Sequence, residues 1–193
     1  RVGSALSGAI TVSQAISPAN VTNLSLLSNA GLSQGAGDTI TVTNLRIDVD
    51  EAVSLNEAND VTILAANVAG GGQAFSFRDA NALQLDTVDG TTGVTVSAAN
   101  VTFTIDAGTF TQDAIEIITA SGLEIVAGGS VTLTEANAIT TLAANVTGAG
   151  NSFDFTEANG FLVGSVGSTD GVNTANGAIT LTATTGNITV TDT

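Results

Sequence analysis

The sequence predicts an all-β parallel β-helix (β-solenoid) of about nine coils, with a β-sandwich of short strands as the alternative. Three observations favour this fold class. Apolar residues alternate with polar ones at period two, Gly and Asn separate the short strand segments, and an internal repeat covers most of the chain. A unit of about 20 residues cannot bury its own apolar face, whereas a stack of such units can. We therefore expect residues 1–193 to form a single solenoid.

The first 52 residues contain the most degenerate coils. Residues 40–49 (ITVTNLRIDV) keep the rhythm of two short strands, and residues 10–27 keep it loosely around Pro18. Proline cannot donate a hydrogen bond to a strand ladder, so we expect an irregular register there.

The best repeats are residues 53–130 and 131–193. A shift of 78 positions aligns residues 53–94 with residues 131–172 without a gap, and half of the aligned residues are identical. Shorter units within the repeats begin at apolar residues, and we expect each unit to be one coil. These units begin at Val53, Phe75, Val94, Ile115, Val131 and Phe153.

Period-two alternation predicts which side chains point into the core. They are Val53, Leu55, Phe75, Phe77, Val131, Leu133, Phe153 and Phe155. The Ala-rich segment 138–146 permits a short helix, but Gly148 ends it, so we expect a strand and a turn.

An asparagine recurs six positions after the first apolar residue of five units. The five are Asn59, Asn81, Asn100, Asn137 and Asn159, while Ser121 followed by Gly122 takes this place in the fourth unit. Asn tolerates the positive φ of tight turns, and stacked amides can hydrogen-bond along a column. We expect a structural Asn ladder, the alternative being a ladder that binds a ligand.

Charge excludes several function classes. Eighteen acidic residues oppose Arg1, Arg46 and Arg78, and the net charge is −15. Nucleic-acid binding is excluded because Lys and Arg, which neutralise phosphates, are nearly missing. No apolar run is long enough for a membrane-spanning helix, so we expect no membrane insertion. The lack of cysteine suits export from a bacterium, and we expect a mature chain at an extracellular or cell-surface location.

Residues 176–190 (NGAITLTATTGNITV), together with the Asn-Val-Thr and Glu-Ala-Asn units, resemble a known group of proteins. These are the repeat regions of filamentous-haemagglutinin-type exoproteins and of the related giant bacterial adhesins and autotransporter passengers. The resemblance implies a right-handed β-helix, export to the bacterial surface, and an adhesive or structural role. Host or cell-surface glycans are then candidate partners. The secretion domain and membrane barrel of such proteins are not part of this sequence, so we expect a fragment or processed segment.

The available side chains argue against catalysis. Polysaccharide cleavage needs a base such as Arg or Lys, or paired carboxylates in a groove. Arg46 and Arg78 are the only interior cations, and the chain has no His, Tyr, Lys or Trp. We expect no enzyme. A carbohydrate-active β-helix enzyme stays an alternative, as does an ice-binding module built on the Thr-x-Thr pairs.

Calcium is the best candidate for a bound ion, because hard cations require several oxygen ligands. The densest acidic cluster is Asp48, Asp50 and Glu51, with Asp60 expected in the following coil. Neither an EF-hand loop nor a glycine-rich calcium nonapeptide is present. The alternative is surface charge that keeps the rod soluble.

The coil ends predict self-association. Residues 2–12 and 179–193 read as strands with hardly any charge, whereas natural sheet edges are normally protected by charge, Pro or a covering element. We expect a component of a bacterial extracellular filament, sheath or surface layer. Its partner is itself, through head-to-tail or lateral contacts, or further repeats of a longer polypeptide.

Overall fold

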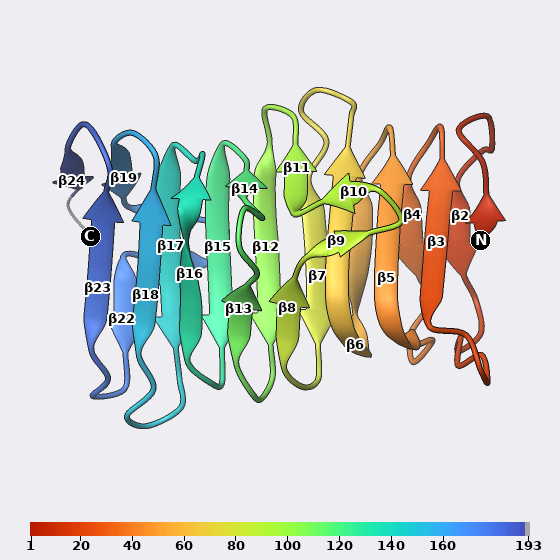
Figure 1. Ribbon diagram of the computed structural model, residues 1–193, viewed down its shortest axis with the longest axis horizontal. Coiled ribbons are helices and arrows are strands. Elements are labelled where there is room, and N and C mark those ends of the chain that lie inside the picture. The colour runs from red at the N-terminus through yellow and green to blue at the C-terminus, as the bar shows by residue number, and fades with distance from the viewer. Residues whose placement is uncertain (192–193) are drawn as a thin grey trace.

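The computed structural model describes residues 1–191 and shows a parallel β-solenoid of about eight turns (Figure 1). The described residues contain strands and no helix, so the predicted fold class is confirmed, with about one coil fewer than expected. The two ends of the described chain lie at opposite ends of the rod. Asp192, the last charge of the sequence, lies outside the described residues.

Two parallel sheets line the long sides of the solenoid. Sheet A contains β1 (Val2–Gly3), β3 (Asn23–Ser28), β5 (Thr41–Val49), β8 (Leu83–Leu85), β11 (Val94–Val96), β13 (Phe110–Gln112), β14 (Ile118–Thr119), β16 (Val131–Asn137), β18 (Phe153–Glu157) and β23 (Ile179–Ala183). Sheet B contains β2 (Ile10–Val12), β4 (Leu32–Gln34), β7 (Phe75–Asp79), β12 (Asn100–Ile105), β15 (Gly122–Ala127), β17 (Thr141–Val146), β19 (Phe161–Val163), β22 (Val172–Thr174) and β24 (Ile188–Val190). The long strand β6 (Val53–Val68) bends from sheet B into sheet A.

The core lies between the sheets and is built as expected from period-two alternation. All eight side chains predicted to point inward are at most 2% exposed. The Phe75 and Phe77 rings are 6.4 Å apart, and those of Phe153 and Phe155 are also 6.4 Å apart. Segment 138–146 contains strand β17, so the strand prediction holds there.

The sequence predicted that each short unit forms one coil and that the units stack in one column. The structure differs from this prediction. Val53 pairs with Phe75, but Phe75 pairs with Val101, and Val94 lies in the other sheet beside Ala66. The reason is that extra residues loop out between β8 and β11, so strand Val94–Val96 closes one coil instead of beginning the next.

Residues that are related by the 78-residue shift lie in different sheets. Three coil steps in sheet B lead from Val53 through Phe75 and Val101 to Leu123, and Val131 then lies in sheet A. One repeat therefore equals three coils and roughly half of a fourth. The backbone follows the same shift, because positive φ recurs at Gly93 and Gly171 and at Gly108 and Gly186, among others.

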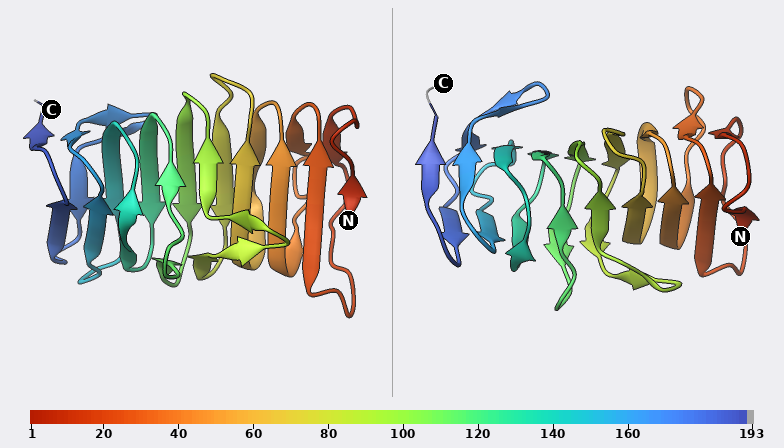
Figure 2. Two further views of the ribbon diagram at one scale, coloured as in Figure 1. Left: turned by 45° about the horizontal axis from the view of Figure 1, so that its top comes forward. Right: turned by 90° about the horizontal axis from the view of Figure 1, so that it is seen from above.

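Two β-hairpins lie outside the solenoid, and the same shift relates them. β9 (Thr87–Val88) pairs with β10 (Thr91–Thr92), and β20 (Ser165–Val166) pairs with β21 (Thr169–Asp170), each antiparallel. The right-hand view of Figure 2 shows them on opposite sides of the rod. This follows from the exchange of sheets, since equivalent segments of the two repeats face opposite ways.

Candidate interaction surfaces

The four acidic residues predicted to bind calcium do not converge. Asp48 forms an ion pair of 2.6 Å with Arg46 and accepts a hydrogen bond from Asn67. Asp50 and Glu51 are exposed in the following turn. Asp60 pairs with Thr41, at the opposite end of β5, and accepts a hydrogen bond from Asn81. Across residues 1–191, no three acidic side chains are grouped so that they could hold a metal ion.

Asn59 and Asn137 are fully buried and hold the bend between two sheets. The Asn59 Oδ1 accepts hydrogen bonds from Gln34 and from the Ile40 amide, at 2.6 and 2.8 Å. Its Nδ2 donates to backbone carbonyls, including that of Arg78 at 3.0 Å. Asn137 repeats this network 78 residues later with Gln112, Ile118 and Thr156. Each amide thus joins neighbouring coils at a corner, which is a structural role.

The five conserved-spacing asparagines do not form one ladder. The strand register places Asn59 beside Asp79 and Asn100 beside Gly122. Asn81, Asn100 and Asn159 are exposed. Extending the 78-residue shift upstream of Val53 reveals the pair Gln34 and Gln112, the partners of the two buried asparagines, which the sequence reasoning missed.

Asp79 is a buried carboxylate at the same corner. Burial raises its pKa to about 6, although hydrogen bonds from the backbone amides of Asn81 and Val61 oppose this shift, and the nearby acids Asp60 and Asp106 add to it. Its equivalent in the second repeat, Glu157, is also buried and accepts a hydrogen bond from the Asn159 amide. These acids accept bonds from backbone amides at the corner, which is a structural use of a carboxylate.

Each hairpin folds back over the outer face of earlier coils and is fastened there by polar contacts. The Asp89 carboxylate at the first tip accepts hydrogen bonds from Asn23 and Ser25, and these bonds hold its pKa below the usual range. At the second hairpin, Glu124 of the sheet accepts bonds from Ser168 and Thr169. Burial raises the pKa of Glu124, but these hydrogen bonds outweigh burial and the net pKa is lowered. The hairpins were not predicted, although Asp89-Gly90 is a strong hairpin-turn signal.

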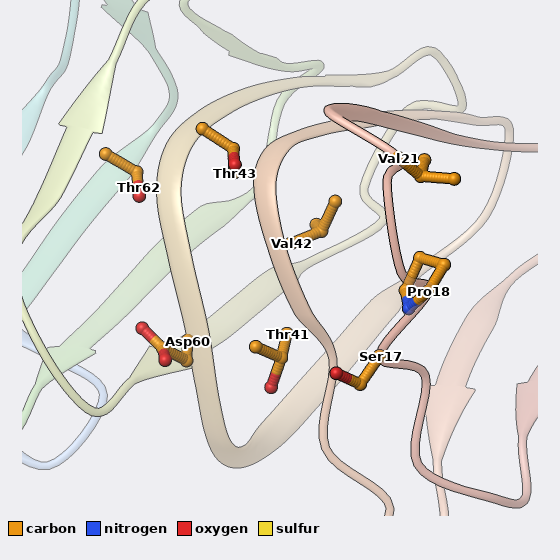
Figure 3. A pocket seen from close by; sticks show the side chains of 8 residues that line it. All are labelled: Ser17, Pro18, Val21, Thr41, Val42, Thr43, Asp60 and Thr62. Atoms are coloured by element: carbon orange, nitrogen blue, oxygen red, sulfur yellow. The ribbon is translucent and has the colours of Figure 1, made fainter.

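Two grooves on the sides of the rod are open and polar. One, of about 310 Å³, is lined by residues of the loop before β3 and of β5 and β6 (Figure 3). Its lining includes Thr41 beside the carboxylate of Asp60, with Thr43 and Thr62 further along the same strands. A second groove, of about 390 Å³, lies against the first hairpin and includes Arg46.

Threonines stack on the outer face of sheet A in the second half of the rod. Thr111 pairs with Thr132, which pairs with Asp154, which in turn pairs with Thr180. A shorter column places Thr156 beside Thr182. The longer column is interrupted by a charged side chain.

The end of the rod formed by β22, β23 and β24 exposes apolar side chains. Ile179 is 45% exposed and Val190 is 71% exposed, although both belong to columns that are buried elsewhere. A groove of about 320 Å³ opens there, at the end of the core, and is lined by Val163, Asp170, Gly171, Val172, Asn173, Ile179, Leu181 and Val190. At the opposite end, Val2 and Leu6 are 46% and 93% exposed.

Both end coils lack charge in a strongly acidic chain. Residues 2–37 contain no Asp, Glu, Lys or Arg, and neither do residues 171–191. Between them lie 17 of the 18 acidic residues. The lack of charge in the end coils can therefore be recognised from the sequence alone.

Comparisons with known proteins give no relative. No protein-family model matches the sequence, and neither a curated protein nor a solved structure matches it. Among residues 1–191, no helix is long and apolar enough to cross a membrane.

Proposed function

We propose that this chain is a structural rod segment of a bacterial extracellular filament, sheath or surface layer. Its task is to span distance and to present side chains along a rigid surface. In this proposal the chain is not an enzyme. The adhesive character implied by the sequence resemblance belongs to the outer faces, where hydroxyl and amide groups are available to host or cell-surface glycans.

The observation that carries this proposal is the pair of charge-free, apolar end coils. Sheet edges that must stay unpaired are normally protected by charge, by Pro or by a covering element. Here the protecting charges are concentrated in the middle of the rod, and the ends are left ready for strand pairing. Such ends suit a rod that continues into further coils.

Lateral contacts between rods have a different character. The charge of −15 per chain opposes side-by-side packing. Divalent cations that bridge carboxylates of neighbouring rods would offset this repulsion. A chelator should therefore separate bundles into single rods before it disrupts any coil.

Surface labelling tests the proposal. Antibodies raised against the folded chain, applied to intact source cells, should mark fibres, a sheath or a surface layer in electron micrographs. Label confined to the cell interior, or a freely diffusing protein that degrades polysaccharide, would contradict the structural role. A chelator arm then shows whether divalent cations hold the labelled material together.

A further inference from the structure

The end formed by β22, β23 and β24 repeats a surface that is covered inside the rod. A shift of 78 residues relates Ile179, Leu181 and Ala183 of β23 to the buried β12 residues Val101, Phe103 and Ile105. In the middle of the rod these three pair with Leu123, Ile125 and Ala127 of the next coil. Inside the rod, the equivalent surface is therefore covered by a further parallel coil.

The backbone groups at this end are also ready for pairing. The Ala178 carbonyl accepts a hydrogen bond from the Phe153 amide, and the Thr184 amide donates one to the Glu157 carbonyl. The backbone N–H and C=O groups of the even-numbered residues of β23 therefore point toward β18. The N–H and C=O groups of alternate residues in a parallel strand point toward opposite neighbours. Those of Ile179, Leu181 and Ala183 therefore point toward the free edge. At the equivalent internal position, the Ile105 carbonyl accepts a hydrogen bond of 2.8 Å from the Gly128 amide.

We propose that the occupant of this end is the N-terminal coil of a second copy of the chain, stacked head to tail. This inference rests on the proposed structural role and names its partner. β1 and β2 belong to sheets A and B, as β23 and β24 do, so head-to-tail stacking joins each sheet to its own kind. The parallel ladder then continues unchanged.

Charge and shape also favour this pairing. Arg1 is the only charged residue among residues 1–37, and the groove at the other end contains Asp170. The exposed Leu6 and Val2 are the apolar side chains available to fill that groove. Contact between two N-terminal ends, or between two C-terminal ends, would bring identical surfaces together, and their strands would have to pair antiparallel.

Blocked ends test the direction of stacking. One variant of the full chain carries Ile179→Lys and Val190→Lys, and a second carries Val2→Lys and Leu6→Lys. Each change places a charge at an exposed position on one end only. Thr132→Lys, on the exposed outer face of β16 in the middle of the rod, is the matched control.

Light scattering after size exclusion gives the readout. Wild type and Thr132→Lys should form oligomers whose mass rises with concentration, whereas each end-blocked variant alone should stay monomeric. Mixing the two blocked variants should double the mass, because one free end of each kind remains. A variant that dimerises alone would overturn head-to-tail stacking, as would a wild-type chain that is monomeric at its highest soluble concentration.

Circular dichroism must show unchanged strand content, and Val190→Pro gives a milder block, because the Val190 amide faces the free edge and makes no bond to β19. A monomeric wild type would overturn this inference alone. The structural role is decided separately by surface labelling.

Discussion

The 78-residue shift relates Arg46 to Glu124, and these two residues bind the tips of the first and the second hairpin with opposite polarity. The Arg46 Nη1 donates to the Asp89 carbonyl at 3.2 Å, while the Glu124 carboxylate accepts from the Ser168 amide at 2.9 Å. Both contacts join the sheet to a hairpin tip, but the side chain from the sheet is a cation at Arg46 and an anion at Glu124. Each hairpin is matched to its own site.

The first prediction concerns these hairpin contacts. In Glu124→Ala the second hairpin loses its acceptor, so amide exchange across residues 165–170 should accelerate about tenfold, equivalent to about 1.4 kcal/mol. Exchange in the first hairpin should not change. Asp89→Ala is the matched control and should release only residues 87–92. Equal acceleration of both hairpins in either variant would contradict independent fastening.

The second prediction concerns the corner asparagines. Asn59→Ala and Asn137→Ala each leave several buried backbone groups unpaired, and each should lower the free energy of unfolding by about 3 kcal/mol. Because the two networks are equivalent, the two losses should agree within about 1 kcal/mol. Asn81→Ala removes an exposed side chain and should cost about 0.5 kcal/mol. Denaturant titration measures all three, and a large loss only for Asn81 would refute the assignment.

The third prediction is a pH dependence. Burial raises the pKa of Asp79 from 3.8 to about 6, so the folded chain binds a proton more tightly than the unfolded chain. Stability from this group is therefore present at low pH and is lost as pH rises from about 4 to about 6. The loss should be about 2 kcal/mol.

Asp79→Asn should remove this part of the pH dependence, and melting curves between pH 4 and pH 7 measure it. Asp154→Asn, which removes a carboxylate from the outer side of β18, is the control and should keep the wild-type slope. A slope in Asp79→Asn as steep as that of wild type would assign the pH dependence to other groups.

The fourth prediction concerns backbone strain at Ile115. This β-branched residue has a φ of 73°, and the 78-residue shift relates it to Gly37, which has a φ of 80°. Left-handed backbone is costly for a β-branched side chain and easy for glycine. Ile115→Gly should therefore raise the free energy of unfolding by about 1 kcal/mol, after the entropy that glycine adds to the unfolded chain. Ile117→Gly, two residues further on at a position without a positive φ, should instead destabilise the fold.

The strand content and the inward side chains could be predicted because period-two alternation reports directly on burial. Val53, Phe75 and Phe153 point inward as expected. The stacking register could not be predicted, because it depends on which residues leave the coil. The hairpin Thr87–Thr92 displaces Val94 into the other sheet, and nothing in the apolar pattern distinguishes a looped-out strand from a coil strand.

The candidate surfaces were predicted less completely. The charge-free ends were visible in the sequence, but the distance along the strands between the acidic residues was not. Asp48 and Asp60 were assigned to adjacent coils, which is correct, yet Asp60 pairs with Thr41, at the opposite end of β5 from Asp48. Assignment to adjacent coils gives the position of a residue along the rod axis only. Its position along the strand depends on bends such as that in β6.

The exchange of sheets by the 78-residue repeat gives the rod an approximate twofold screw axis. Any feature encoded once per repeat, such as a hairpin, is placed alternately on the two sides, and the true period along the axis is two repeats. A layer of such rods would have no inner and outer surface set by the repeats themselves. Sidedness in a sheath or surface layer would have to come from differences between successive repeats, of which Arg46 and Glu124 are one.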